Sequence, residues 1–293
     1  MNEEAINEIN TTDENCSGSC ATCGSTSCSE KQAPTPRYAR CIVALASGKG
    51  GTGKSVMACL LAGELRQLGC TVGILDADLA CPAIPMLMGS EALADSDESH
   101  VFPVTAANGV RYISMGNIYD KPESPLLWYG KDQAGGAQYF YTDVQWEDPD
   151  VLIVDMPSGF GDIPLQLYTV IPFDAAVLVG TPDPVCDRML KKTRALLQMV
   201  YVPVMGVIEN RVPDAQTAAE HAEAVGARLL AAFPEDEPLA RAAAAGALYG
   251  RSAAGLRPLA GALKEIAQRS GALNAAASAA ATDVGQRTAE QAQ

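Results

Sequence analysis

Positive charge and aromatic side chains are both scarce in this chain of 293 residues. It has 21 lysines and arginines against 35 aspartates and glutamates, so its formal net charge is -14. Such an acidic protein repels nucleic-acid phosphates and anionic lipid headgroups, which disfavours both as default partners. Aromatics make up only 5% of the residues, and aliphatic side chains supply most of the apolar content. That composition suits a parallel sheet covered on both faces by helices.

Long apolar runs are missing as well. No stretch approaches the roughly 20 apolar residues that cross a bilayer. The first residues, Met1 to Asn10, are acidic and polar and do not resemble a secretory signal. Five of the nine cysteines are scattered through the apolar part of the chain, as in proteins kept in a reducing compartment. We therefore expect a cytoplasmic protein that binds neither membrane nor nucleic acid.

Residues 1–36 lack hydrophobic periodicity and end in Pro34-Thr35-Pro36, which is typical of a linker. We expect a flexible arm. It carries four cysteines at the spacing Cys-x3-Cys-x2-Cys-x4-Cys, namely Cys16, Cys20, Cys23 and Cys28. Four thiolates this close can hold one inorganic centre, and an iron–sulfur cluster needs such a compact set. Structural zinc is the main alternative, although its cysteine pairs usually lie further apart, and disulfides or free thiols remain open.

The most informative stretch is Gly48-Lys49-Gly50-Gly51-Thr52-Gly53-Lys54-Ser55. It fits the phosphate-loop pattern of Gly, four residues, then Gly-Lys-Ser. An apolar run at 41–45 predicts a strand before it, and 56–68 predicts a helix after it, which is the context that the motif requires. The glycines let backbone N–H groups turn inward around a polyphosphate. We expect Lys54 to reach the β- and γ-phosphates of ATP and the Ser55 hydroxyl to ligate Mg²⁺, with Lys49 as an extra cation.

Two further apolar strands end in carboxylates. The predicted strand 71–75 leads into Asp76-Ala77-Asp78, and the predicted strand 151–155 ends in Asp155. Carboxyl ends of parallel strands face the ligand crevice. Four apolar residues followed by Asp form the second signature of P-loop proteins, whose carboxylate bonds Mg²⁺ or its water. At the end of strand 71–75, one carboxylate could join the Mg²⁺ shell and the other could orient the attacking water, unless both only keep the strand end soluble.

The remaining sequence predicts further strand–helix units. We expect strands at 109–115, 175–179, 203–208 and 227–233, and helices at 132–145, 185–200, 215–225, 236–246 and 255–270. Residues 79–88 contain two prolines and are predicted to be a loop. Asn210, at a strand end, is a candidate for reading an adenine ring through its amide, with a plain turn role as the alternative. Residues 271–293 are rich in Ala, Thr and Gln and predict a disordered tail.

With Lys49 in the loop, Ser47 to Ser55 resembles the deviant Walker A loop of the MinD/ParA/NifH-type ATPases. Other stretches resemble the Mrp/Nbp (ApbC-like) branch of ATP-binding iron–sulfur cluster carriers. They are Leu75 to Asp78 with Pro82 and Pro85, Trp128 to Gly130, Ile153 to Asp162, and Glu209-Asn210. The N-terminal cysteines are similar to the set ahead of the domain in Nbp-type members. The expected organisation is a P-loop α/β domain at 37–270, one doubly wound, mostly parallel sheet, between the arm 1–36 and the tail 271–293.

This resemblance implies a homodimer that couples ATP hydrolysis to the loading or handover of a cluster, of 4Fe-4S type, to apo iron–sulfur proteins. Lys49 would reach toward the partner's nucleotide, Asp78 would lie in the first switch, and Asp155 would lie in the second. These three would be the catalytic residues. Alternatives are a MinD/ParA-like ATP-dependent positioning switch or a NifH-like ATP-driven reductase.

The sequence also departs from that family. Many members carry a Cys-x-x-Cys shortly after the Glu-Asn pair, whereas the last cysteine here is Cys186. Cys81 stands where a glycine is usual, and Ser158 stands where a second proline is usual. The pattern therefore does not support a cluster shared across the dimer interface. A reductase would need two interface cysteines per subunit, and a positioning switch would need a basic surface or a basic amphipathic helix.

Overall fold

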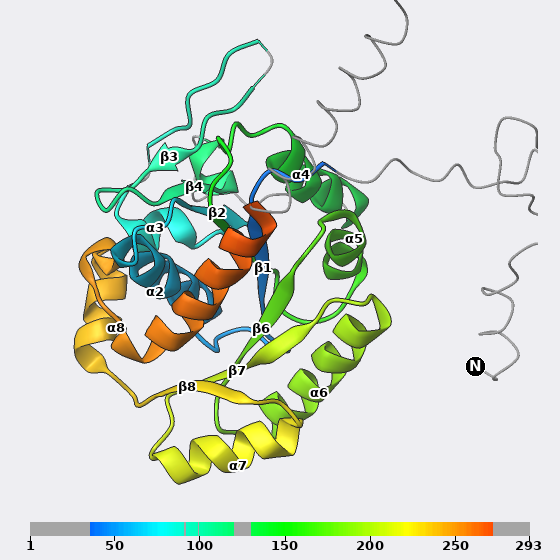
Figure 1. Cartoon of the computed structure of the whole chain (residues 1–293), viewed down its shortest axis with the longest axis vertical. Helices are drawn as coiled ribbons and strands as arrows, with labels where there is room; N and C mark the ends of the chain where they lie inside the picture. Colours follow the sequence, from blue (N-terminus) through cyan, green and yellow to red (C-terminus); the bar gives the residue numbers. More distant parts are fainter. Residues whose placement is uncertain (1–35, 91, 99, 120–129, 272–293) are drawn as a thin grey trace, which may run out of the picture. The chain divides into compact units, whose positions relative to one another are not determined.

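Eight strands form one sheet in the order β3-β4-β2-β5-β1-β6-β7-β8 (Figure 1). Every neighbouring pair is parallel except β3 and β4. The bounds are Cys41–Ala46 for β1, Val72–Asp76 for β2, Val104–Thr105 for β3, Arg111–Ile113 for β4, Val151–Asp155 for β5, Ala175–Gly180 for β6, Val204–Asn210 for β7 and Leu229–Phe233 for β8. The predicted mostly parallel sheet is confirmed.

The computed structural model describes residues 36–90, 92–98, 100–119 and 130–271, without the side chains of 130–134. The predicted ligands Cys16, Cys20, Cys23 and Cys28, the stretch at Trp128 and the tail from 272 lie outside these residues. What the sequence predicts for them, and the division at 36 and 270, stays a prediction. Among the described helices, none combines the length and apolar character that crossing a bilayer demands.

Helices cover both faces of the sheet (Figure 1). Their bounds are Lys54–Gln67 for α2, Ile84–Met88 for α3, Gly130–Thr142 for α4, Asp162–Val170 for α5, Pro184–Met199 for α6, Ala215–Val225 for α7 and Glu237–Ala244 for α8, followed by an unlabelled helix at 257–271. Helices α2, α3, α8 and 257–271 pack on one face, and α4 to α7 pack on the other.

The central strand β1 shows why the sheet needs both layers. Alternate residues of β1 point to opposite faces: Val43 and Leu45 belong to the core under α2, whereas Ile42 and Ala44 belong to the core under α4 to α7. All of β1 is buried. A strand buried on both faces reads as a continuous apolar run, which is what the sequence has at 41–45.

Two helices differ from the sequence predictions. The prediction of a loop at 79–88 is wrong in its second half, where α3 forms. Pro85 occupies the first turn of α3, where a proline gives up no hydrogen bond, and Gly89 ends the helix at φ 72°. Helix α5 was not predicted, because Asp162 to Val170 is short and Pro164 falls in its first turn.

Candidate nucleotide-binding site

The phosphate loop joins the end of β1 at Ala46 to the start of α2 at Lys54. Strand β5 lies between β1 and β2, with Leu45 and Asp76 each in register with Asp155. The carboxyl ends of these three strands therefore bring the loop, Asp76 and Asp155 to one edge of the sheet. The structure thus assembles the loop and both carboxylates where the sequence placed them.

Two glycines of the loop are required by their surroundings. A Cβ atom on Gly48 would lie 2.3 Å from Cβ of Met189 and 2.6 Å from its carbonyl carbon, so only glycine lets the loop lie this close to α6. Gly53 precedes α2 with a φ of 88°, a backbone conformation that glycine adopts without strain. The loop shape predicted from the glycine pattern is therefore fixed partly by packing against α6.

The lysine and the aspartate of the two P-loop signatures meet in the interior. Lys54 Nζ lies 2.6 Å from Asp155 Oδ1, and the side chains are 7% and 0% exposed. The second carboxylate oxygen, Asp155 Oδ2, is buried without a hydrogen-bond partner among the described residues. A buried, unpaired carboxylate oxygen is costly, and a cation or its bound water would satisfy it. The donor set at Ser55 and Asp155 therefore fits Mg²⁺, which prefers oxygen ligands.

Asp76 and Asp78 have different surroundings. The buried carboxylate of Asp76 accepts hydrogen bonds from the Ser114 hydroxyl (2.9 Å) and from the backbone N–H groups of Asp78, Ala83 and Ile84 (3.1–3.3 Å). It thereby holds the segment that leads into α3. Burial, and then the neighbouring Asp155, raise the pKa of Asp76 to about 7.

Asp78 is only partly buried and accepts one backbone hydrogen bond, from Cys81 N–H at 3.2 Å. Burial raises the pKa of Asp78, and Lys54 opposes that rise. Of the two carboxylates, Asp78 therefore has more freedom to meet a ligand, while Asp76 shapes the loop.

The extra loop lysine, Lys49, forms an ion pair within the described chain. Lys49 Nζ lies 2.6 Å from Asp183 Oδ2, which also accepts from the Thr181 hydroxyl. The other oxygen of Asp183 accepts the Cys186 N–H at 2.8 Å and so caps α6. Partial burial works against the charge of Asp183, but the hydrogen bonds from Lys49, Cys186 and Thr181 prevail and lower its pKa to about 2.

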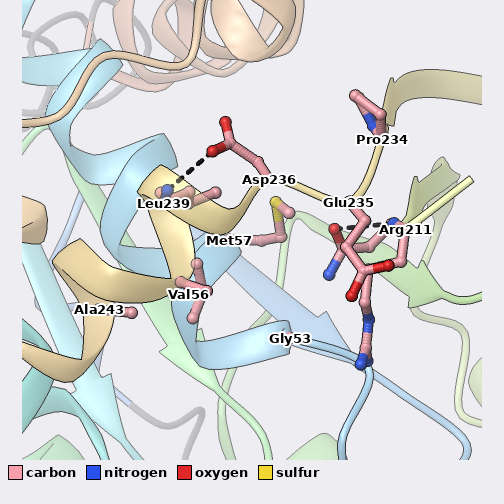
Figure 2. A pocket seen from close by; sticks show the side chains of 11 residues that line it. Gly53, Val56, Met57, Arg211, Pro234, Glu235, Asp236, Leu239 and Ala243 are labelled. Carbon is pink, nitrogen blue, oxygen red and sulfur yellow. Dashed lines mark hydrogen bonds between the residues drawn. The ribbon is translucent and has the colours of Figure 1, made fainter.

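A pocket of about 210 Å³ opens beside the loop. Figure 2 shows it between the start of α2, with Val56 and Met57, and α8, with Leu239 and Ala243. Asn210 also lines it, and its amide Nδ2 donates to the Thr52 carbonyl at 2.8 Å. The candidate residue for reading a base therefore lies at a partly apolar pocket next to the phosphate loop, with one amide hydrogen already engaged.

Residues 39–269 match the family model described as ParA: NUBPL iron-transfer P-loop NTPase. The chain belongs to this family. Among its relatives, the iron–sulfur cluster carrier protein of Methanococcus maripaludis is 33% identical over 210 residues, which is 67% of this chain and 73% of the relative. The iron–sulfur cluster carrier protein of Clostridium perfringens is 33% identical over 213 residues, or 66% of this chain and 75% of the relative.

Solved structures show the same fold for this NUBPL-type NTPase. A nucleotide-binding protein from Archaeoglobus fulgidus, in complex with ADP, is 27% identical and covers 72% of this chain and 88% of its own, at a TM-score of 0.61. The septum site-determining protein MinD of Pyrococcus horikoshii, in complex with Mg-ADP, is 19% identical, covers 78% and 95%, and has a TM-score of 0.53. At that identity the likeness to MinD shows the fold alone.

The sequence analysis did not predict the contacts of two site residues, Asp183 and Arg211, or the burial of Glu209 next to Asn210. Asp183 could have been predicted as a helix cap, because an Asp followed by Pro184 is typical of a helix start. The sequence does not show that its second carboxylate oxygen forms an ion pair with Lys49. Arg211 donates from its guanidinium to the Gly51 carbonyl, and nothing in its local pattern indicates this contact. Glu209 is fully buried, with neither carboxylate oxygen hydrogen-bonded to a described residue.

Glu209 makes folding stability depend on pH. Burial raises its pKa to about 7; Asp187 and Asp183 add to this rise, while His221 opposes it. The folded-state pKa lies above the unfolded value, so the folded protein binds the extra proton between them. Stability should therefore increase as pH falls from about 8 to about 6, by about 1 kcal/mol from this one group.

Urea unfolding near these two pH values measures the change, and Glu209→Gln provides the control because its amide does not titrate. The difference in stability between wild type and variant should shrink toward low pH. A difference that is the same at both pH values would contradict the assignment of this titration to Glu209.

Proposed function

We propose that this chain is an ATP-binding and ATP-hydrolysing iron–sulfur cluster carrier that passes a cluster to apo-proteins. The observation that carries the proposal is the family match over residues 39–269, which includes the whole phosphate loop, Asp78, Asp155 and Asn210. The relatives named iron–sulfur cluster carrier proteins support the cluster part. The ADP complex of the Archaeoglobus fulgidus protein supports the nucleotide part.

The residues of the site divide the work on ATP. Lys54 would leave Asp155 and bind the β- and γ-phosphates, while the loop N–H groups and the start of α2 would hold the same anion. Ser55 and Asp155 would hold Mg²⁺, Asp155 directly or through a water. The ion held there would supply positive charge that offsets the negative charge developing on the phosphates. Asp78 would orient the attacking water, since its carboxylate is only lightly engaged.

Lys49 would act across a homodimer. In the described subunit it is bound to Asp183, so reaching a partner's nucleotide requires that this ion pair opens. The two side chains are 35% and 33% exposed, and breaking an ion pair this exposed costs little free energy. Hydrolysis and cluster transfer would be coupled because ATP and ADP favour different arrangements of the dimer.

The cluster, as cargo, would be held by Cys16, Cys20, Cys23 and Cys28 ahead of the domain, as a 4Fe-4S cluster in the cytoplasm. Five other cysteines are described, and four of them are buried. Burial raises the pKa of the thiols of Cys41, Cys59, Cys70 and Cys186, which disfavours the thiolate that a metal needs. These four are therefore poor ligands, which leaves the N-terminal set and the exposed Cys81.

Metal analysis of a matched set of variants tests the cluster proposal. We expect anaerobically reconstituted wild type to bind iron and sulfide and to show charge-transfer absorbance with an electron paramagnetic resonance signal after reduction. Cys20→Ala/Cys23→Ala should lose most of the iron, because two of four thiolates are gone. Cys81→Ala, which removes an exposed cysteine of the domain, should keep it.

Two outcomes would refute this assignment. Wild type without iron or sulfide after reconstitution would exclude the carrier function. Equal iron in wild type and in Cys20→Ala/Cys23→Ala would show that the N-terminal cysteines are not the ligands. Zinc measured in the same samples distinguishes the structural-zinc alternative.

A further inference from the structure

Two neighbouring side chains at the end of β7 hold the phosphate loop from its outer side. Asn210 Nδ2 donates to the Thr52 carbonyl at 2.8 Å, and the Arg211 guanidinium donates to the Gly51 carbonyl. The carbonyl of Gly53 is also engaged, by the Met57 N–H in the first turn of α2 at 3.0 Å. Three successive loop carbonyls thus each have a donor, and two of these donors are the side chains of Asn210, the last residue of β7, and of Arg211, which follows it.

These carbonyls determine where the loop N–H groups point. A peptide unit is planar and trans, so the C=O of one residue and the N–H of the next point in opposite directions. Holding the carbonyls of Gly51, Thr52 and Gly53 outward therefore directs the N–H groups of Thr52, Gly53 and Lys54 to the inner side. These are donors that a phosphate would meet.

The loop needs such restraint because of its composition. Gly51 and Gly53 have φ values of 79° and 88°, and glycine can exchange between this region and others at little cost. A rotated peptide would turn a carbonyl oxygen toward the phosphates and repel them. Donors anchored on β7 oppose that rotation before any ligand binds.

The anchoring side chains are themselves fixed. The Arg211 N–H donates to Asn210 Oδ1 at 3.0 Å, which leaves Nδ2 of the same amide to donate to Thr52. Arg211 has a φ of 57°, a left-handed conformation that is unfavourable for a residue with a side chain. In Figure 2, Arg211 lies on the side of the pocket next to Gly53. The turn after β7 thus keeps a strained residue whose side chain reaches the loop.

We propose that Asn210 and Arg211 are positioning residues that orient the peptide groups of Gly51 to Gly53, so that the loop binds the polyphosphate of the nucleotide whatever base is attached. The inference rests on the proposed nucleotide site and adds to it how the site is organised. It separates two roles for Asn210, because reading adenine concerns only the base, whereas orienting the loop concerns the phosphates.

The test compares ATP with inorganic triphosphate, each with Mg²⁺, on the full chain by competition against a fluorescent ADP. Arg211→Ala should weaken both ligands by a similar factor of about ten or more, the usual effect of one lost hydrogen bond from a charged group. Asn210→Asp should weaken both at least as much, because a carboxylate cannot donate to the Thr52 carbonyl. Arg194→Ala is the matched control: it removes a guanidinium bond to the Gly226 carbonyl, of 2.8 Å, between α6 and α7. It should leave both affinities unchanged.

One more pair of variants separates the hydrogen bond from the charge. Arg211→Gln keeps a hydrogen-bond donor without the charge and should retain most of the affinity for ATP and triphosphate. If Arg211 acted only by attracting phosphate, Arg211→Lys would bind with wild-type affinity, and Arg211→Gln would bind as weakly as Arg211→Ala. That second pattern would overturn the inference. So would Asn210→Asp or Arg211→Ala weakening ATP but not triphosphate, or wild type binding ATP but not triphosphate.

Hydrogen exchange on the ligand-free protein provides a readout independent of affinity. Exchange of the Met57 amide, which donates to the Gly53 carbonyl of the loop, should speed up in Arg211→Ala and stay unchanged in Arg194→Ala. Unchanged exchange in both variants would refute the positioning role. If wild type bound neither ATP nor triphosphate, the nucleotide site itself would be wrong. Failure of the variants alone would leave the proposed function intact and remove only this inference.

Discussion

Replacing Lys54 with methionine should destabilise the nucleotide-free protein by about 3 to 5 kcal/mol, the usual cost of removing one partner from a buried ion pair. The expected cost is high because Asp155 is 0% exposed and its Oδ2 already has no partner among the described residues. The variant should also lose ATP hydrolysis by more than about 100-fold, since the cation that would stabilise the transferring phosphoryl group is absent. Urea unfolding and phosphate release measure the two effects.

The double variant Lys54→Met/Asp155→Leu tests whether the unpaired carboxylate is the cause. Replacing both members of a buried pair with apolar residues is often neutral, so the double variant should recover most of the stability while remaining inactive. Lys49→Met is the exposed counterpart, because its pair with Asp183 is 35% and 33% exposed; it should cost about 1 kcal/mol or less. If the double variant lost as much stability as Lys54→Met and Asp155→Leu lose separately when added together, this account would be contradicted.

The sequence was sufficient to predict strands and helices that have a regular hydrophobic pattern or clear capping residues. Strand β5 and helix α7 have the predicted bounds, 151–155 and 215–225, because an unbroken apolar strand and a capped helix both carry strong local signals. The prediction of a loop was wrong at α3 because the two prolines within 79–88 indicate a loop, although the first turn of a helix accepts a proline. Local rules therefore predicted most elements but missed two short helices, α3 and α5, each of which has a proline in its first turn.

The site divides along the same lines. Lys54 and Asp155 could be paired from sequence because each belongs to a known signature and both follow strands of one parallel sheet. The contacts of Lys49 with Asp183 and of Arg211 with Gly51 could not, because they depend on how α6 and β7 pack beside the loop, 134 and 160 residues away in the chain. Spacing along the chain contains no information about which of several acids or carbonyls such packing selects.

Gly48→Ala should cost about 3 kcal/mol of stability, at the upper end of what overpacking costs. Its new Cβ would lie 2.3 Å from Met189 Cβ and 2.6 Å from a backbone carbon of α6, and it would lie 2.9 Å from the Leu190 nitrogen. Backbone atoms of a packed helix cannot move aside as the end of a flexible side chain can. Either the loop or α6 must shift, so ATP hydrolysis should also fall, by about 100-fold for a displacement near 1 Å.

Gly50→Ala is the matched control within the same loop. A Cβ at Gly50 would meet nothing closer than Ser158 Oγ at 3.7 Å, an ordinary van der Waals contact. The folded protein should therefore keep its stability in Gly50→Ala, whatever happens to nucleotide binding. Thermal and urea unfolding of the two variants, without nucleotide, isolate the packing effect. Equal stability of Gly48→Ala and Gly50→Ala would show that the loop does not need its close contact with α6. A large loss in Gly48→Ala alone would show that this glycine is required for packing before any phosphate is bound.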